Sequence, residues 1–281
     1  MKKTACVVIP IYKEKPTDWE TASFRQVLKV LSRYDIFIYT HRGLDLSFYI
    51  TEAESYNKDF KIEYFDKGFF SSVKGYNRFC LTVDFYKRVS LYEYMLIYQL
   101  DAWVFRDELE YWCNKGYDYI GAPFFDDFGS YENGNKLWTV GNGGFSLRRT
   151  EFCMNFLSYK FPIYFHIDFN KGLRAFMKSC LKSVGICNTV QWYVKHMNYW
   201  INEDHFFTNF IKNMSKRKVF TPKIPLPEEA ATFSFEQSPS YLYDLCGKRL
   251  PFGCHAFEKY EFDTFWKKHI IYETLCNYNK L

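Results

Sequence analysis

The sequence lacks the short motifs by which several large enzyme classes hold their ligands. Its 281 residues contain no G-x-G-x-x-G run and no Walker-type phosphate loop, which disfavours Rossmann dehydrogenases and P-loop enzymes. It has no C-x-x-C pair, and its nine cysteines are an odd number placed mostly among apolar residues. This usage favours buried thiols in a reducing compartment over a disulfide framework or a zinc site.

Long apolar runs and dense charge are also absent. No segment reaches the roughly 18 apolar residues of a membrane span. The opening "MKKTACVVIPIYKEK" begins like a signal peptide, but Pro10 and Lys13 interrupt its apolar run, so we interpret it as a first strand. The net charge of +5 is spread along the chain, and the basic stretch at 212–223 is typical of a solvated loop. We therefore expect a cytoplasmic protein with no nucleic-acid partner.

What the chain does have is a large apolar fraction in an alternating pattern of strands and helices. Apolar residues make up 48% of the chain, enough for a full core. The pattern of the first half predicts strands at 5–12, 34–41, 60–66, 92–101 and 117–123, and helices at 17–33, 71–89 and 107–116. Such a strand–helix–strand start predicts a right-handed parallel α/β unit.

The second half continues with fewer strands. A polar loop at 126–138 precedes "TVGNGGFSLRR" at 139–149 and a helix from about 150, and the stretch 164–200 is interpreted as mostly helical. A further helix is predicted at 202–212. From about 220 the chain is irregular and then helical, ending in a helix at 261–278. With no repeat and no linker, we expect one domain over 1–281, an α/β fold whose mostly parallel central sheet is flanked by helices.

Asp101 is the first candidate for chemistry. It ends "YQLD", at the close of the most apolar strand, and ligands of open parallel sheets bind at the carboxyl ends of strands. A carboxylate there can hold Mg²⁺ or Mn²⁺ while leaving positions for diphosphate oxygens. Taken alone, a strand-end aspartate is also typical of a loop or helix cap, although Asp107 is the better placed cap.

Three later motifs carry polar groups that could reach the same edge. "VGNGGFSLRR" sets Asn142 among glycines, which allows close backbone approach to a ligand or a tight turn. "NEDHFF" places Glu203 and Asp204 at a helix start, as simple caps or as a general base for a sugar hydroxyl. "GCHAF" places His255 after an irregular segment, where it is structural or a metal or phosphate contact.

The order of these motifs resembles that of GT-A glycosyltransferases. It is most similar to an uncharacterised bacterial and viral glycosyltransferase-like family with Q-x-D-A, D-Y-I-G-A-P, G-N-G-G-x-S-L-R and E-D-x-F-F motifs in this order. The resemblance covers roughly residues 4–260. It implies a GT-A-like fold and the transfer of a sugar from a nucleotide-sugar donor, such as a UDP-sugar, to a hydroxyl of a glycan or lipid-linked acceptor, with inversion. The expected setting is bacterial surface polysaccharide or lipopolysaccharide synthesis.

The resemblance also implies roles for individual residues. Asp204 or Glu203 would be the base, and a divalent metal, Mn²⁺ or Mg²⁺, would be held by Asp101 and His255. The donor would contact strand ends, one helix and the glycine-rich turn through Pro10, Ile11, Tyr12, Asn77, Arg78, Asp101, Ala102, Trp103, Asn142, Gly143 and Gly144.

Trp103 is the departure from the GT-A pattern, because many such enzymes carry a second acid there. Trp103 would stack on a sugar or base, or pack in the core. Its presence keeps open a second reading, a catalytically degenerate module that binds a nucleotide or glycan. A glycoside hydrolase using Glu203 or Asp204 is a third. Loose association with the inner face of the plasma membrane is also expected if the acceptor is lipid-linked. The terminal "FWKKHIIYETLCNY" would contribute to it, although its pattern favours an amphipathic helix packed on the core.

Overall fold

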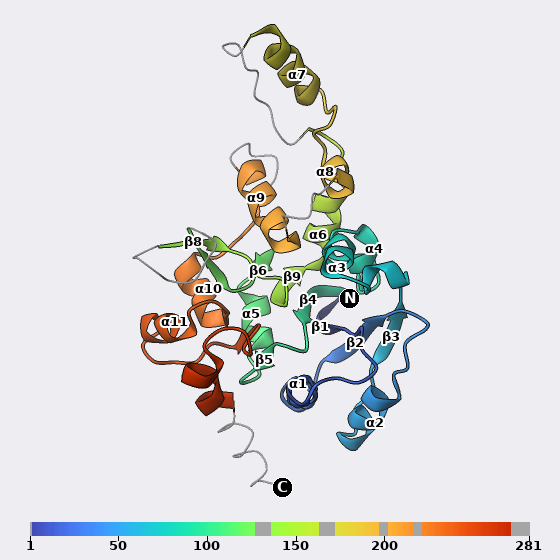
Figure 1. Cartoon of the computed structure of the whole chain (residues 1–281), viewed down its shortest axis with the longest axis vertical. Helices are drawn as coiled ribbons and strands as arrows, with labels where there is room; N and C mark the ends of the chain where they lie inside the picture. The colour runs from blue at the N-terminus through green and yellow to red at the C-terminus, as the bar shows by residue number, and fades with distance from the viewer. Residues whose placement is uncertain (1, 127–135, 163–171, 197–201, 216–220, 271–281) are drawn as a thin grey trace.

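A six-stranded, mostly parallel sheet forms the centre of the computed structural model, which describes residues 2–126, 136–162, 172–196, 202–215 and 221–270 (Figure 1). The strand order is β3-β2-β1-β4-β9-β6. The first four strands run parallel, and β9 is antiparallel to both β4 and β6. The expectation of an α/β fold with a mostly parallel sheet flanked by helices is confirmed.

The elements of the first half follow the predicted alternation. The strands of this half are β1 (Lys3–Pro10), β2 (Asp35–Thr40), β3 (Lys61–Tyr64), β4 (Tyr92–Tyr98), β5 (Trp103–Val104), β6 (Tyr119–Ile120) and β7 (Pro123–Phe125). The helices are α1 (Asp18–Val30), α2 (Ser47–Ser55), the 3-10 turn η1 (Lys67–Phe69), α3 (Val73–Cys80), α4 (Val83–Lys87) and α5 (Leu109–Asn114). Of the elements of this half, α2, η1 and β5 had no predicted counterpart.

The second half adds four strands and several helices. Its strands are β8 (Leu137–Val140), β9 (Phe145–Arg149), β10 (Ser234–Phe235) and β11 (Gly253–Cys254). Its helices are α6 (Thr150–Leu157), α7 (Leu173–Ser183), α8 (Val190–His196), α9 (Glu203–Ser215), α10 (Pro227–Phe233), α11 (Pro239–Leu245) and the π-helical turn η2 (Phe262–Trp266).

Local sequence explains where several of these elements begin. Thr17 caps α1 through a capping box, in which its hydroxyl accepts from the Glu20 amide and the Glu20 carboxylate accepts from the Thr17 amide. The predicted helix over 71–89 divides into α3 and α4, because Thr82 caps a new helix at Val83. The predicted strand over 92–101 ends at Tyr98, and Asp101 lies in the turn that follows.

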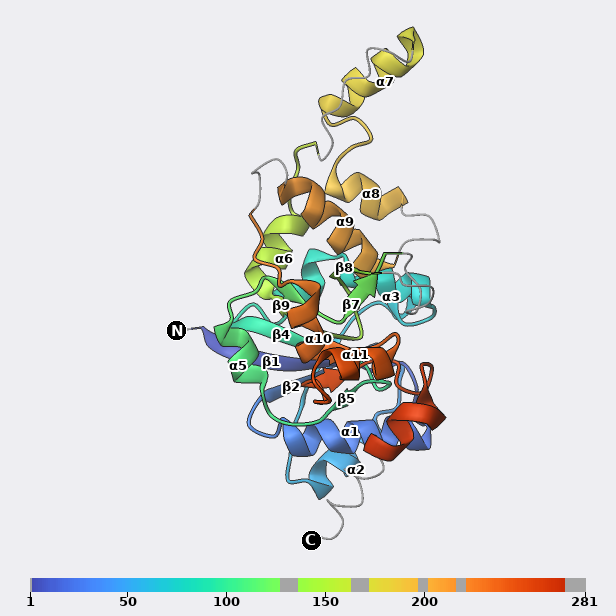
Figure 2. The same cartoon turned by 90° about the vertical axis from the view of Figure 1, so that its left-hand side faces the viewer.

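Two apolar layers cover the sheet. One face packs against α1, α2 and α5 through residues such as Val7, Phe24 and Leu96. The other face packs against α3, α4, α6 and α9 through residues such as Val8, Phe85 and Phe207. The helix α7 extends away from these layers, at the far end of the long axis of the molecule (Figures 1 and 2).

The segment after 220 is more ordered than its prolines predict. The strands β10 and β11 form a second sheet with β5, in the order β10-β11-β5, and Trp266 packs with Phe105 in a separate apolar cluster. Of the predicted last helix, Phe265, Trp266 and Ile270 are buried in this cluster, and 271–278 lies outside the described residues. Parts of the predicted loop at 126–138, of the stretch 164–200 and of the basic stretch at 212–223 also lie outside them.

None of the helices in the described ranges has both the length and the apolar character needed to cross a bilayer.

Candidate functional site

A pocket of about 440 Å³ opens at the carboxyl ends of β1 and β4, where open parallel sheets bind ligands. Five separate parts of the chain line it besides α3 and the loop before it. They are the end of β1, the end of β4, the glycine turn before β9, the start of α9 and the residue after β11. The polar and glycine residues that line it from these parts are Tyr12, Gln99, Gly143, Gly144, Asn202, Glu203, Asp204 and His255.

His255 is held between acids and an amide at one side of this pocket. Its Nε2 lies 3.2 Å from Asp101 Oδ1 and 3.2 Å from Gln99 Oε1, and its Nδ1 lies 3.3 Å from Glu236 Oε2. Burial acts to lower the pKa of His255, but Asp101 and Glu236 outweigh it and raise that pKa well above its ordinary value. The two acids therefore favour the protonated imidazole.

The small second sheet explains why two residues 154 positions apart meet. Antiparallel pairing sets Cys254 of β11 opposite Trp103 of β5. In an antiparallel ladder the next residue on one strand faces the previous residue on the other, so His255 falls beside the Ala102 position. Asp101 is the neighbour of Ala102, and its carboxylate reaches the imidazole. Figure 2 shows β5 beside the C-terminal elements that carry His255.

The donor atoms at this point suit a divalent ion. Asp101 Oδ1, Gln99 Oε1 and His255 Nε2 offer two oxygens and one nitrogen within a few ångströms of one another. Glu236 contacts the other ring nitrogen of His255, Nδ1. A carboxylate often contacts the ring nitrogen that does not bind the metal in metal-bound histidines. Among the described residues no group of three or more His, Cys, Asp or Glu side chains could hold an ion alone. An ion would therefore need substrate oxygens or water, which is common for Mg²⁺ at diphosphates.

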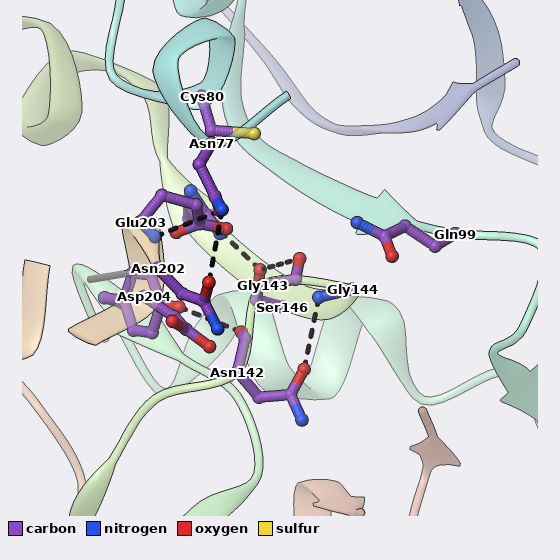
Figure 3. A network of polar contacts seen from close by, with 12 residues as sticks. Asn77, Cys80, Gln99, Asn142, Gly143, Gly144, Ser146, Asn202, Glu203 and Asp204 are labelled. Carbon is purple, nitrogen blue, oxygen red and sulfur yellow. Dashed lines mark hydrogen bonds and ion pairs between the residues drawn. The ribbon is translucent and has the colours of Figure 1, made fainter. Parts of the chain in front are cut away.

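Asp204 supplies a second carboxylate, from the first turn of α9 (Figure 3). Burial raises its pKa to about 7, and the charges of Glu203 and Glu236 act in the same direction. Its Oδ1 accepts a hydrogen bond from the His205 amide at 2.7 Å. A carboxyl that titrates near neutrality can take or give a proton at physiological pH, as a general base or acid must.

The neighbouring Glu203 is engaged in the interior. Its Oε1 pairs with Arg148 Nη2 at 2.9 Å, and both side chains are buried. Arg148 also donates to Ser146 and to Tyr86 and lies over the ring of Tyr119. Arg148 is thus a structural residue and not an exposed phosphate ligand. Glu203 Oε2 is buried with no hydrogen-bond partner among the described residues, although Glu203 lines the pocket.

The glycine turn at Gly143 and Gly144 lies against the side chains of Glu203 and His255. A Cβ on Gly143 would lie 2.0 Å from Glu203 Oε1, and one on Gly144 would lie 1.9 Å from His255 Nε2. Asn142 adopts a positive φ of 70°, and its Oδ1 accepts from the Gly144 amide at 3.1 Å (Figure 3). Asn142 therefore holds the turn from the buried side, and the glycines let Glu203 and His255 approach the pocket.

Asn77 joins α3 to the start of α9. Its Oδ1 accepts from the Glu203 amide at 3.1 Å, and its Nδ2 donates to Asn202 Oδ1 at 3.2 Å (Figure 3). These bonds satisfy an amide at the helix start that has no partner within the helix. Asn77 lines the pocket as well, so it belongs to the site and fixes the helix that carries Asp204.

Several expected donor contacts lie elsewhere. Ile11 and Ala102 are buried, with Ile11 in the main core and the Ala102 carbonyl bound by Ser23. Trp103 is buried against Phe257, in the apolar cluster beside the second sheet, where β5 pairs with β11. Arg78 lines a different hollow, on the side of α3 that faces α8.

Pro10 and Tyr12 line the pocket as expected. Asp101 borders it through His255 and does not line it.

Two residues of the site escaped the sequence-based reasoning. Gln99 stands two positions before Asp101 and was noted only as part of Q-x-D-A. Glu236 lies in "FSFEQSP", a segment whose composition predicts no element, and only the pairing of β10 with β11 brings it to His255. No local pattern could have indicated it.

Comparison with solved structures finds similarity to several glycosyltransferases. Mouse xyloside xylosyltransferase 1 matches with 10% identity and a TM-score of 0.46, over 90% of this chain and 97% of that one. A glycosyltransferase involved in glycosylating the major capsid of PBCV-1 matches with 10% identity and a TM-score of 0.40, over 95% and 98% of the chains.

Core-mannan synthase A of Aspergillus fumigatus, in a Mn/GDP form, matches with 9% identity and a TM-score of 0.40, over 53% of this chain and only 60% of its own. Scores this low leave substrate and chemistry to be inferred from the residues of this chain.

No curated protein matches the sequence. A family model does match residues 59–255, a range that contains Asp101, Asp204 and His255. By that match the chain belongs to the DUF5672 family, described as proteins of unknown function.

Proposed function

We propose that the chain is a glycosyltransferase that moves a sugar from a nucleotide-sugar donor, such as a UDP-sugar, to a hydroxyl of a glycan or lipid-linked acceptor. The observation that carries this proposal is the placement of Asp204, with its pKa raised to about 7, on the same pocket as His255. One group suits a proton transfer and the other suits a diphosphate. An inverting glycosyl transfer from a nucleotide donor uses both.

In this proposal the donor diphosphate lies at the His255 side of the pocket. The imidazole ring of His255 would face the diphosphate oxygens. A Mn²⁺ or Mg²⁺ ion would be held there by Asp101, Gln99 and His255. Such an ion would stabilise the negative charge of the leaving diphosphate. Pro10 and Tyr12 would border the nucleoside, because they lie at the end of β1 on the pocket wall.

Asp204 acts as the base in this arrangement. As the acceptor hydroxyl forms a bond to the anomeric carbon, its proton passes to the Asp204 carboxylate, and the bond from that carbon to the diphosphate breaks. This single displacement inverts the anomeric carbon. Glu203 is less suited to the role, since its Oε1 is held by Arg148. Its second oxygen can accept a hydrogen bond from a substrate hydroxyl.

The test is turnover of a panel of nucleotide sugars by the full chain, with and without Mn²⁺, measured as released nucleotide. We expect at least one donor to be hydrolysed slowly or transferred, with Mn²⁺ increasing the rate. Asp204→Asn should keep donor affinity and lose about 10²- to 10⁴-fold in rate, the usual contribution of a general base. Exposed Asp59 offers the matched control Asp59→Asn, which should retain the full rate.

Two outcomes would contradict the proposal. Donor binding with no turnover across several acceptors would favour a binding module that has lost catalysis, and release of sugar from a glycan without any nucleotide would favour a hydrolase. Full turnover by Asp204→Asn would remove Asp204 from the mechanism.

A further inference from the structure

The helix α7 has an exposed apolar face for which the proposed transferase activity has no use. Its large apolar side chains recur at intervals of three and four residues, at Leu173, Met177, Leu181 and, just past its end, Val184. This spacing sets them on one face of a helix. Their exposed fractions are 74%, 56%, 47% and 73%. Single exposed apolar residues are ordinary, but a continuous stripe of this kind marks an interaction surface.

A second stripe of positive charge runs beside the first. Arg174, Lys178 and Lys182 recur at intervals of four residues, each one position after an apolar residue of the stripe. The described segment 172–196 contains no aspartate or glutamate. The exposed side of α7 is therefore half apolar and half cationic, with no acid to neutralise it within this segment.

The position of α7 leaves this side available. Figures 1 and 2 show it at one end of the long axis, beyond α8 and away from the sheet, in both views. No other described helix or strand packs extensively along it. The opposite side of the helix contains Ser179, which is buried. The apolar stripe thus lies on the exposed side of the helix, opposite Ser179.

We propose that α7 docks the protein on an anionic lipid surface, with its apolar stripe in the interface and its cations against lipid phosphates. An amphipathic helix with apolar residues on one face and Lys or Arg on the other is the pattern of helices that lie in a membrane interface. The adjacent charges select the occupant. A second copy of the same face would bring like charges together, and a nucleic acid would leave the apolar stripe in water. An anionic lipid surface offers apolar chains to the apolar stripe and phosphates to the cationic stripe.

This proposal does not depend on the transferase activity. It is tested by co-sedimentation of the full chain with vesicles of phosphatidylcholine alone and of phosphatidylcholine mixed with phosphatidylglycerol. We expect binding to the mixed vesicles and much weaker binding to the neutral ones. Raising the salt concentration should weaken the binding, since it screens the Lys and Arg contribution.

Variants assign the effect to α7. Met177→Gln with Leu181→Gln keeps good helix formers and should weaken binding about tenfold or more, because two apolar side chains no longer enter the interface. Replacing Arg174, Lys178 and Lys182 by Gln should reduce the preference for anionic vesicles by about fivefold for each charge removed. The matched control is Leu91→Gln with Leu226→Gln, two still more exposed apolar residues outside α7, and this variant should bind as the wild type does.

Circular dichroism and the melting temperature establish that each variant is folded. Binding to mixed vesicles that is no stronger than to neutral ones would overturn the proposal. So would a folded α7 variant that binds as tightly as the wild type. A wild type that is dimeric and binds no lipid, with a monomeric Met177→Gln and Leu181→Gln variant, would assign the stripe to a second copy of the chain. That result would also overturn the proposal.

Discussion

At the scale of single residues, Asp204 has the sharpest consequence. As a base it must be ionised, and its pKa is raised to about 7. We therefore expect the transfer rate at low donor concentration to rise with pH through about 7 and to level off above it. A pH profile of turnover measures this directly. A rate that stays flat from about pH 5 to pH 8 would contradict the assignment.

The raised pKa of Asp204 also predicts how stability depends on pH. The contribution of this carboxyl to folding stability falls as pH rises, whereas the transfer rate rises. Its pKa is 3.8 in the unfolded reference and about 7 in the fold, so the folded state binds this proton more tightly. That contribution is complete below about pH 4 and is lost as pH rises through about 7. Asp204→Asn should thus raise the melting temperature more at about pH 8 than at about pH 5. An equal shift at both values, or one equal to that of Asp59→Asn, would argue against a buried, ionisable Asp204.

Gly144 tests the geometry around His255. A Cβ there would meet the imidazole Nε2 at 1.9 Å, so the ring must move. We expect Gly144→Ala to weaken nucleotide binding and to cost about 1–3 kcal/mol of stability, as overpacking does. Gly43→Ala is the control, since its Cβ would find ordinary contacts with His41 at 3.5 Å and beyond. Nucleotide affinity that is unchanged in Gly144→Ala would show that His255 is not at the binding site.

At the scale of elements, the buried Arg148–Glu203 pair fixes β9 to α9. Removing one partner strands the other charge, so Arg148→Met should cost about 3–5 kcal/mol in the free energy of unfolding. The double change Arg148→Met with Glu203→Gln should recover a large part of this loss, because no buried charge remains. Denaturant unfolding of the singles and the double measures the coupling. Additive losses would contradict a direct pair.

Sequence periodicity was sufficient for the elements of the sheet and much less so for the edges of the site. β1, β2 and β4 are buried on both faces and appear as continuous apolar runs, which predict strands directly. The end of β4 was misplaced by three residues, because apolar residues continue at Leu100 and Ala102 after pairing stops at Tyr98. β10 and β11 are two-residue strands that only their tertiary partners stabilise, and so no local pattern predicts them.

The candidate site shows the same division. Asp101, Gly143, Asp204 and His255 were singled out because each stands at an element boundary in a run of unusual composition, and their roles stay predictions. Ile11 and Trp103 were assigned to the donor through the family resemblance, with core packing left open for Trp103. Both side chains are buried in the structure.

At the scale of the whole molecule, the pocket and the α7 tip lie in different parts of the chain. Figure 1 shows α7 beyond α8, whereas the pocket is lined from the edge of the sheet and the start of α9. We expect Met177→Gln with Leu181→Gln to leave turnover of a soluble donor unchanged in the absence of vesicles. A large loss of soluble activity in this variant would mean that α7 takes part in the catalytic fold. Nucleotide release by wild type and variant, assayed side by side, provides the comparison.

We propose that Asp101 and His255 together bind the diphosphate at one side of a nucleotide-sugar pocket. Calorimetric titration of UDP with Mn²⁺ into the full chain tests it most directly, using wild type, Asp101→Asn and the surface control Asp107→Asn, whose carboxylate pairs with Arg33. The account predicts Mn²⁺-dependent binding of UDP, lost or weakened at least about tenfold in Asp101→Asn and kept in Asp107→Asn. UDP that binds Asp101→Asn as tightly as the wild type, or that binds none of the three proteins, would contradict it.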